Sequence, residues 1–318
     1  MGGFYLVDGF KFQLASSRSY PHIFKSFKEY HMRFSVFGIV GLLLVFAGCS
    51  LQKLAIKSAT PIFSSGVEAL YEETDLQLAE QAIGSNLKLL EGLYKSNPKN
   101  KDVLLLLTQG YASYSLGFVE DDSVERAKLF YLRARDYGFK LLHTTSAFKD
   151  SIPQREQLFV DRLSRLKKND VPAIFWTAFA WGSWINLSKN DPQAIFDLGK
   201  VKALMNKVIE LDEGFFFGSA HLFFGAVSGA LPKMLGGDPE KARQHFERSL
   251  ALSNDKFVLA YVYLARYYAQ TLLDEDLFDQ YLQKVDEASL EILPENKLIT
   301  AIAKEKARRL KEKKAELF

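Results

Sequence analysis

The apolar positions of this chain repeat with a helical period over nearly all of its length beyond residue 65. No segment there alternates apolar and polar residues between turns, as a half-buried strand would. Asp75 is a predicted N-cap, and the helix that follows it ends before Asn97-Pro98. Its core-facing residues are spaced by three or four positions: Leu76, Ala79, Ile83, Leu87, Leu90 and Leu93. The pattern predicts an all-α protein.

Two segments share a longer pattern, in which a glycine precedes a small–large–small triplet by 17 residues. In a tetratricopeptide pair the glycine lies where the first helix meets the second, and the triplet Ala-x3-aromatic-x2-Ala lies on the second helix. The two units are Gly110 with Ala127, Tyr131 and Ala134, and Gly225 with Ala242, Phe246 and Ser249. Both spacings are longer than in a usual tetratricopeptide pair, and by the same amount. The loop between the two helices is therefore expected to be enlarged equally in both units.

Two further helix pairs extend this pattern. One combines residues 176–184 with 201–211, and the other combines residues 261–268 with 277–284. Residues 150–169 fit no unit and predict an inserted helix. Stacked pairs bury one face on each neighbour and expose a curved inner face that is suited to binding. We therefore predict a helix-turn-helix, tetratricopeptide-like array over residues 66–318, with residues 296–318 as a C-terminal capping helix.

The N-terminal segment has the layout of a secretory signal. Residues 34–48 are apolar and uncharged, but the stretch is shorter than the roughly 20 residues that span a bilayer. Arg33 precedes it, and the small pair Ala47-Gly48 follows just before Cys49. A signal that ends at a cysteine looks like that of a bacterial lipoprotein, in which the thiol takes a diacylglyceryl group. The alternative is a buried helix or a short anchor with an incidental cysteine.

This interpretation divides the chain into three parts. Residues 1–48 are the signal peptide, residues 49–65 a lipidated tether and residues 66–318 the helical domain. Met32 is an alternative start that would leave residues 1–31 outside the protein. Phe46 stands where an aliphatic residue is usual, which resembles the relaxed lipoprotein signals of spirochaetes. We expect Cys49 to carry the lipid and to hold the domain at a membrane face.

Charge and cysteine content exclude several classes of function. The chain has 41 Lys/Arg and 38 Asp/Glu, but residues 1–48 hold five of the basic residues and only two of the acidic ones. The remainder is neutral overall, whereas a nucleic-acid-binding protein needs a positive excess, so no nucleic acid is expected as a partner. Cys49 is the only cysteine, which rules out an intrachain disulfide and a cysteine-rich zinc site. No cofactor or metal is expected.

No motif predicts catalysis. The glycine-rich run 236–240 lacks the spacing of a phosphate-binding loop and predicts a turn with Asp238 as N-cap and Pro239 at the first helical position. His221 lies in an apolar segment, far in the sequence from the other histidines, and is expected to be a hydrogen-bonded core residue. The carboxylate pair Asp121-Asp122 is expected on a solvated turn. The chain is therefore not expected to be an enzyme.

Aromatic residues are the candidate binding groups. Trp181 and Trp184 share one face of a helix, whereas Phe175 and Phe179 share another. Because both faces cannot meet the same neighbour, either all four belong to the core, or some line a pocket for an apolar or amphipathic ligand. In the second case Asn186 supplies a polar group. The candidate ligand-binding residues are Trp181, Trp184, Asn186 and Phe223.

Several of these segments together resemble one known family. Residues 110–114, 180–184, 231–243 and 261–268 are similar to the T component of TRAP transporters, and the resemblance covers roughly residues 75–293. It implies a periplasmic lipoprotein, of the spirochaete type, with concealed tetratricopeptide-like repeats and no catalytic residues.

The resemblance also implies partners. The first is the TRAP periplasmic substrate-binding protein, which this chain would dock near the membrane. The second is the chain itself, as a ring-like homo-oligomer with a trimer as the expected form. An apolar passage through each subunit would hand over ligand. The alternative function is that of a structural scaffold lipoprotein of envelope assembly, with the aromatic residues purely as core.

Overall fold

The computed structural model describes residues 65–230, 234 and 236–318. These belong to one compact unit, Ile56–Phe318. The predicted signal peptide, Cys49 and nearly all of the predicted tether lie outside the described residues. In the part of the chain that is described, no helix is long and apolar enough to cross a membrane.

The predicted all-α fold is confirmed: the described residues form helices and turns without a strand. The α-helices before the aromatic segment are α2 (Leu76–Ser96), α3 (Lys101–Phe118), α4 (Val124–Leu142) and α5 (Glu156–Arg162). The next are α6 (Val171–Leu187), α7 (Pro192–Asp212), α8 (Phe215–Ala230) and α9 (Pro239–Leu252). The last are α10 (Leu259–Leu264), α11 (Gln270–Leu272), α12 (Glu275–Glu287), α13 (Lys297–Glu312) and α14 (Lys314–Leu317).

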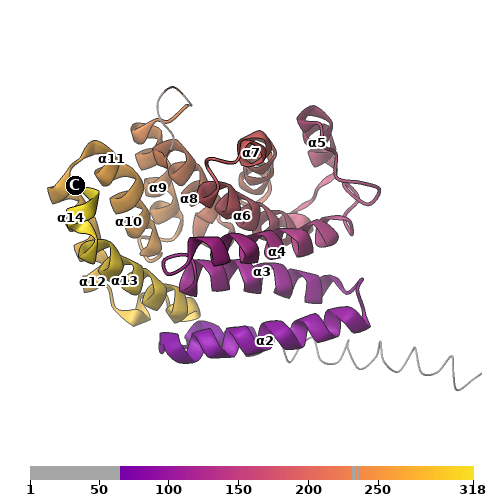
Figure 1. The fold of residues 1–318 in the computed structure, drawn as a ribbon, viewed down its shortest axis with the longest axis horizontal. Helices are drawn as coiled ribbons and strands as arrows, with labels where there is room; N and C mark the ends of the chain where they lie inside the picture. Colours follow the sequence, from indigo (N-terminus) through magenta and orange to yellow (C-terminus); the bar gives the residue numbers. More distant parts are fainter. Residues whose placement is uncertain (1–64, 231–233, 235) are drawn as a thin grey trace, which may run out of the picture. The chain divides into compact units, whose positions relative to one another are not determined.

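Consecutive helices pack as antiparallel pairs, chiefly α3 with α4, α6 with α7 and α8 with α9 (Figure 1). The two predicted N-caps are confirmed. The Asp75 carboxylate accepts hydrogen bonds from the backbone N–H groups of Gln77 and Leu78 and so begins α2. Asp238 caps α9 in the same way, with Pro239 at the first helical position.

The triplets predicted for the second helices lie in the core. Ala127, Tyr131 and Ala134 of α4 are fully buried, as are Ala242, Phe246 and Ser249 of α9. A Cβ at Gly225 would lie 2.6 Å from Cδ1 of Phe246, so this glycine lets the two helices of its own pair approach. A Cβ at Gly110 would instead lie 2.8 Å from Cδ2 of Leu87, in the preceding helix α2. The expectation that Gly110 serves the contact with α4 is wrong.

Several local features depart from regular α-helix, and three of them concern the inserted helix and the segments near α8 and α10. Residues 163–165 and 168–170 form 3-10 turns after α5, which itself confirms the inserted helix and packs against α7. At the start of α8, Phe216, Phe217 and Gly218 have left-handed backbone angles, with φ of 44°, 60° and 68°. Between α10 and α11 a π-helical turn, η4 (Ala265–Ala269), interrupts the α-helix. Left-handed Phe residues and π-turns occur preferentially at functional sites.

The predicted C-terminal helix is present as α13, and it does more than cover the end of the array. It packs against α10 and α12, and also against α2 near the beginning of the described chain (Figure 1). Ile302 of α13 lies close to Gly117 of α3, where a Cβ would meet its Cδ1 at 2.9 Å. The inner face of the array is therefore covered by α13 rather than left open.

Candidate ligand-binding cavity

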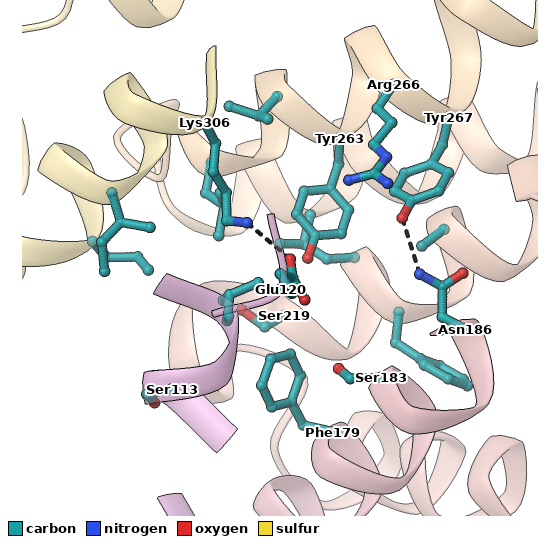
Figure 2. A pocket seen from close by; sticks show the side chains of 18 of the residues that line it. Ser113, Glu120, Phe179, Ser183, Asn186, Ser219, Tyr263, Arg266, Tyr267 and Lys306 are labelled. Atoms are coloured by element: carbon teal, nitrogen blue, oxygen red, sulfur yellow. Dashed lines mark hydrogen bonds and ion pairs between the residues drawn. The ribbon is translucent and has the colours of Figure 1, made fainter. Parts of the chain in front are cut away.

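A cavity of about 270 Å³ lies between α3, α6, α8, α10 and α13 (Figure 2). Most of the side chains that line it are apolar. They include Leu116, Phe175, Trp176, Phe179, Phe216, Leu222, Phe223, Phe257, Leu259, Val262, Leu298, Ile299 and Ile302. A concave, mainly apolar cavity with a few polar groups is the usual form of a small-molecule site.

Aromatic rings from α6 and α8 make one wall of this cavity. Phe175 and Phe179 are one helical turn apart, and their rings stack with centroids 6.1 Å apart. Phe216 meets Trp176 edge to face, with centroids 4.9 Å apart. The left-handed angles at Phe216 and Phe217 thus belong to a segment that lines the cavity.

A buried ion-pair cluster lies on the α13 side of the cavity. Lys306 donates to Glu120 at 2.8 Å and to Asp121 at 2.6 Å, and its side chain is 7% exposed. Tyr131 donates its hydroxyl to the second oxygen of Glu120 at 2.6 Å. Burial opposes the charge of Lys306, but Glu120 and Asp121 outweigh it and raise its pKa. Lys306 is therefore charged, and both carboxylates are already engaged.

A second polar group lies on the other side of Tyr263 in the cavity (Figure 2). Asn186, in the last turn of α6, donates its amide N–H to the hydroxyl of Tyr267 at 3.2 Å. Tyr267 and Arg266 both belong to the π-turn η4, and Gln270 follows directly after it. All four side chains line the cavity.

The structure separates the four residues predicted to bind ligand. Asn186 and Phe223 line the cavity. Trp181 and Trp184 do not line it, and they are 3% and 7% exposed within the core. Trp181 meets Phe139 of α4 edge to face at 5.0 Å. The packing thus favours the core interpretation for the two tryptophans and leaves the pocket interpretation for the opposite face of α6. The ligand-binding role of Asn186 and Phe223 stays a prediction.

Three cavity residues were missed or misplaced by sequence reasoning. Asp121 lies on a turn as expected, with Asp122 exposed beside it, but it lines the cavity and pairs with Lys306, so the expectation that its carboxylate is solvated is wrong. Lys306 and Arg266 were not singled out. Lys306 lies four residues after Ile302 on the buried stripe of α13, and a lysine on an apolar stripe is the signal that identifies it. Arg266 has no comparable signal in its own segment.

A histidine pair lies away from the cavity, between α8 and α9. The Nδ1 atoms of His221 and His245 are 2.9 Å apart, although the two residues are distant in sequence. His221 Nε2 lies 3.1 Å from Glu213, whose carboxylate also accepts from Arg248. His221 is hydrogen-bonded, as expected for a buried histidine, but its partner was not anticipated. Over the described residues, no cluster of histidines, cysteines and carboxylates has the arrangement of a metal site.

The pKa values of this cluster are displaced. Burial lowers the pKa of His221, against the attraction of Glu213. Burial also lowers the pKa of His245, and the charge of His221 adds to the effect. Hydrogen bonds from Arg248 and His221 lower the pKa of Glu213 to about 2. The pair of imidazoles is therefore held neutral beside a fixed carboxylate.

Comparison with known proteins identifies the family. A distant relative is an uncharacterized protein from Treponema pallidum (strain Nichols), 24% identical over 298 residues that cover 84% of this chain and 92% of the relative. The model of the TRAP transporter T-component family matches residues 72–318, and so includes α13 beyond the segment in which the resemblance was recognised. This family is a transporter component family and not an enzyme family. The chain belongs to the TRAP transporter T-component family.

Proposed function

We propose that this chain is a lipid-anchored periplasmic accessory protein of a TRAP-type solute importer. In this role it docks the TRAP substrate-binding protein and receives an apolar or amphipathic ligand in its cavity. Family membership over residues 72–318 supports the accessory role in TRAP transport. The observation that carries the ligand-binding part is the aromatic cavity between α6, α8 and α13.

The chemistry of the cavity fits binding and transfer better than a reaction. Its carboxylates are held by Lys306 and Tyr131, so neither is available as a general base. Its walls offer aromatic surface, whose burial against a hydrocarbon ligand stabilises by roughly 25 cal/mol per Å². The aromatic residues are thus assigned to two tasks, core packing by Trp181 and Trp184 and ligand contact by Phe179 and Phe223, whose side chains keep exposed surface at the cavity.

Co-purification from membranes tests the docking part. A tagged T component, expressed with the TRAP substrate-binding protein of the same organism, is solubilised in mild detergent and captured. We expect the substrate-binding protein to be retained by the wild-type chain. Capture of the T component alone, under conditions in which both proteins are folded and abundant, would favour the envelope-scaffold function instead.

The anchor is tested at Cys49. Because the thiol is the proposed lipid attachment site, Cys49→Ala is expected to leave the precursor uncleaved and unlabelled by radioactive palmitate. The wild-type chain is expected to be labelled and shortened to begin at the cysteine. Labelling that persists in Cys49→Ala would refute the assignment.

A further inference from the structure

Arg266 is a cation of the cavity lining that has no anionic partner among the described residues. Arg266 makes neither an ion pair nor a hydrogen bond with any described residue, and its guanidinium carbon lies 5.5 Å from the centroid of the Tyr267 ring. Tyr267 raises the pKa of Arg266 against the effect of burial, and Glu120 and Asp121 add to the increase. The side chain is thus charged. The side chain keeps exposed surface and forms part of the cavity lining.

The other basic residues around the cavity are arranged differently. Lys306 is bound by Glu120 and Asp121, and Arg309 pairs with Asp122 and Glu305. Lys313 has no ion pair within the described chain, but it lies at the exposed end of α13, where water solvates it. Of the two arginines in the cavity lining, Arg266 is the one whose five N–H donors have no acceptor among the described residues. A carboxylate held in the cavity would supply that acceptor through charge-assisted hydrogen bonds.

Neighbouring groups at this end of the cavity are also donors. The hydroxyl oxygen of Tyr267 accepts from Asn186, so the hydroxyl proton remains available to a ligand. Lys189, two residues after the end of α6, likewise has no ion pair within the described chain. Burial and the charge of Arg266 both lower the pKa of Lys189, which shows that the two cations repel each other. An anion bound between these groups would relieve that repulsion.

The cavity continues from Arg266 into apolar surface. Phe223 and Val227 of α8 line the cavity, and α8 packs directly against the π-turn that carries Arg266. The aromatic wall of α6 lies beyond them. A molecule with one anionic end and one hydrocarbon end matches this gradient of polarity. A carboxylate fits the anionic end, because its two oxygens match the planar fork of a guanidinium.

We propose that Arg266 binds the carboxylate of an amphipathic monocarboxylate, whose hydrocarbon chain lies along the aromatic wall of the cavity. This assignment rests on the proposed ligand-binding function of the cavity and names the ligand class that it takes. Asn186 orients Tyr267, and Tyr267 provides a second hydrogen bond to the carboxylate. The Glu120–Asp121–Lys306 cluster remains closed and takes no part in binding.

Displacement of a neutral dye tests the assignment with residues 50–318, which retain the whole compact unit Ile56–Phe318. Nile red is bound first and then displaced with decanoate or with decanol, which share a chain length and differ in charge. We expect decanoate to displace the dye from the wild-type chain at a concentration about tenfold lower than decanol. This comparison needs no variant, so it stands even if a substitution fails to fold.

Variants then locate the charge that recognises the acid. Arg266→Met is expected to abolish the preference for decanoate while leaving displacement by decanol unchanged. Arg266→Lys keeps the positive charge but loses the paired N–H donors of the guanidinium, and it is expected to keep only part of the preference for decanoate. Arg165→Met is the matched control, because Arg165 is exposed on the 3-10 turn after α5 and does not line the cavity. It is expected to behave like the wild type.

Two outcomes would overturn the assignment in different ways. The role of Arg266 would be overturned if Nile red binds but decanoate and decanol displace it equally. It would also be overturned if the preference for decanoate survives in Arg266→Met. Either result would leave the apolar ligand site intact. Absence of binding by Nile red and by both amphiphiles would overturn this inference together with the ligand-binding part of the proposed function.

Discussion

At the scale of single residues, burial and charge assign the aromatic and basic side chains to separate tasks. Trp181 packs against α4 and α5, while Phe179, two residues earlier and on another face of α6, is half-buried at the cavity. Helical periodicity in the sequence already separated these two faces. It could not tell which face meets a neighbour and which meets a cavity, because that depends on the helices packed against each.

The two faces of α6 are expected to respond differently to truncation. Trp181→Ala removes a core side chain and should lower the free energy of unfolding by about 3–5 kcal/mol, with binding of Nile red retained. Phe179→Ala should weaken dye binding with a smaller loss of stability. Urea denaturation and dye titration measure both quantities. If Trp181→Ala instead loses dye binding and stays within about 1 kcal/mol of the wild-type stability, the assignment of Trp181 to the core and of Phe179 to the cavity would be reversed.

The ion pairs of the cavity are the part of the site that sequence reasoning could not reach. Lys306 and Glu120 are 186 positions apart, and nothing in either segment identifies the other. The same holds for His221 and His245, which belong to different helices and share a contact only after folding. Residues that form a helix surface were predictable from spacing, whereas pairs between distant helices were not.

The histidine pair predicts a loss of stability at mildly acidic pH. The pKa values of His221 and His245 are lowered in the native state, so the unfolded chain takes up protons first as the pH falls below the ordinary histidine value of 6.5. Native stability is therefore fully present above that value and is lost as the pH falls through the lowered values. Urea unfolding at pH 7.5 and 5.5 should show a lower free energy of unfolding at pH 5.5.

His245→Gln serves as the control for this effect. It removes one titrating group and the repulsion that it exerts on the other, so a smaller difference between the two pH values is expected. Glu213, with its pKa lowered to about 2, stays ionised over this range and does not contribute to the difference. Equal stability at both pH values in the wild type would contradict the neutral state of the pair.

At the scale of elements, the helix pairs follow from the sequence and their irregularities do not. Capping residues and apolar spacing predicted α2, the α3–α4 pair and the α8–α9 pair. The left-handed turn that opens α8 and the π-turn at Ala265–Ala269 had no sequence signal. Both occur where side chains line the cavity, and there tertiary packing overrides local preference.

The close contact between α8 and α9 at Gly225 should be sensitive to a single methyl group. Gly225→Ala places a Cβ against the ring of Phe246, which is fully buried and cannot move away, and should destabilise the protein by about 1–3 kcal/mol. Gly92→Ala is the matched control, because nothing lies near the added Cβ and the site is exposed within α2. It should stabilise by up to about 1 kcal/mol. Similar thermal shifts for both variants would contradict close packing at Gly225.

At the scale of the whole domain, α13 packs back against α2 and α3 and covers the inner face of the repeat array. The sequence indicated an inner face suited to binding, but it assigned α13 only to the end of the array. Ion pairs from Lys306 and Arg309 join α13 to the turn between α3 and α4. These contacts cover the apolar inner face, where aromatic residues of α6 and α8 pack against one another and line the cavity.

If this T component docks a TRAP substrate-binding protein, as we propose, the two proteins form a stable complex in solution. Analytical ultracentrifugation of residues 50–318 and of that protein, each alone and together, tests it most directly. We predict that the chain alone sediments as a homo-oligomer, with a trimer as the expected form, and that the mixture gives a new and faster species of fixed stoichiometry. The docking role would be contradicted if the two proteins sediment independently at concentrations up to about 100 μM. That result would mean a binding free energy weaker than roughly −5.5 kcal/mol.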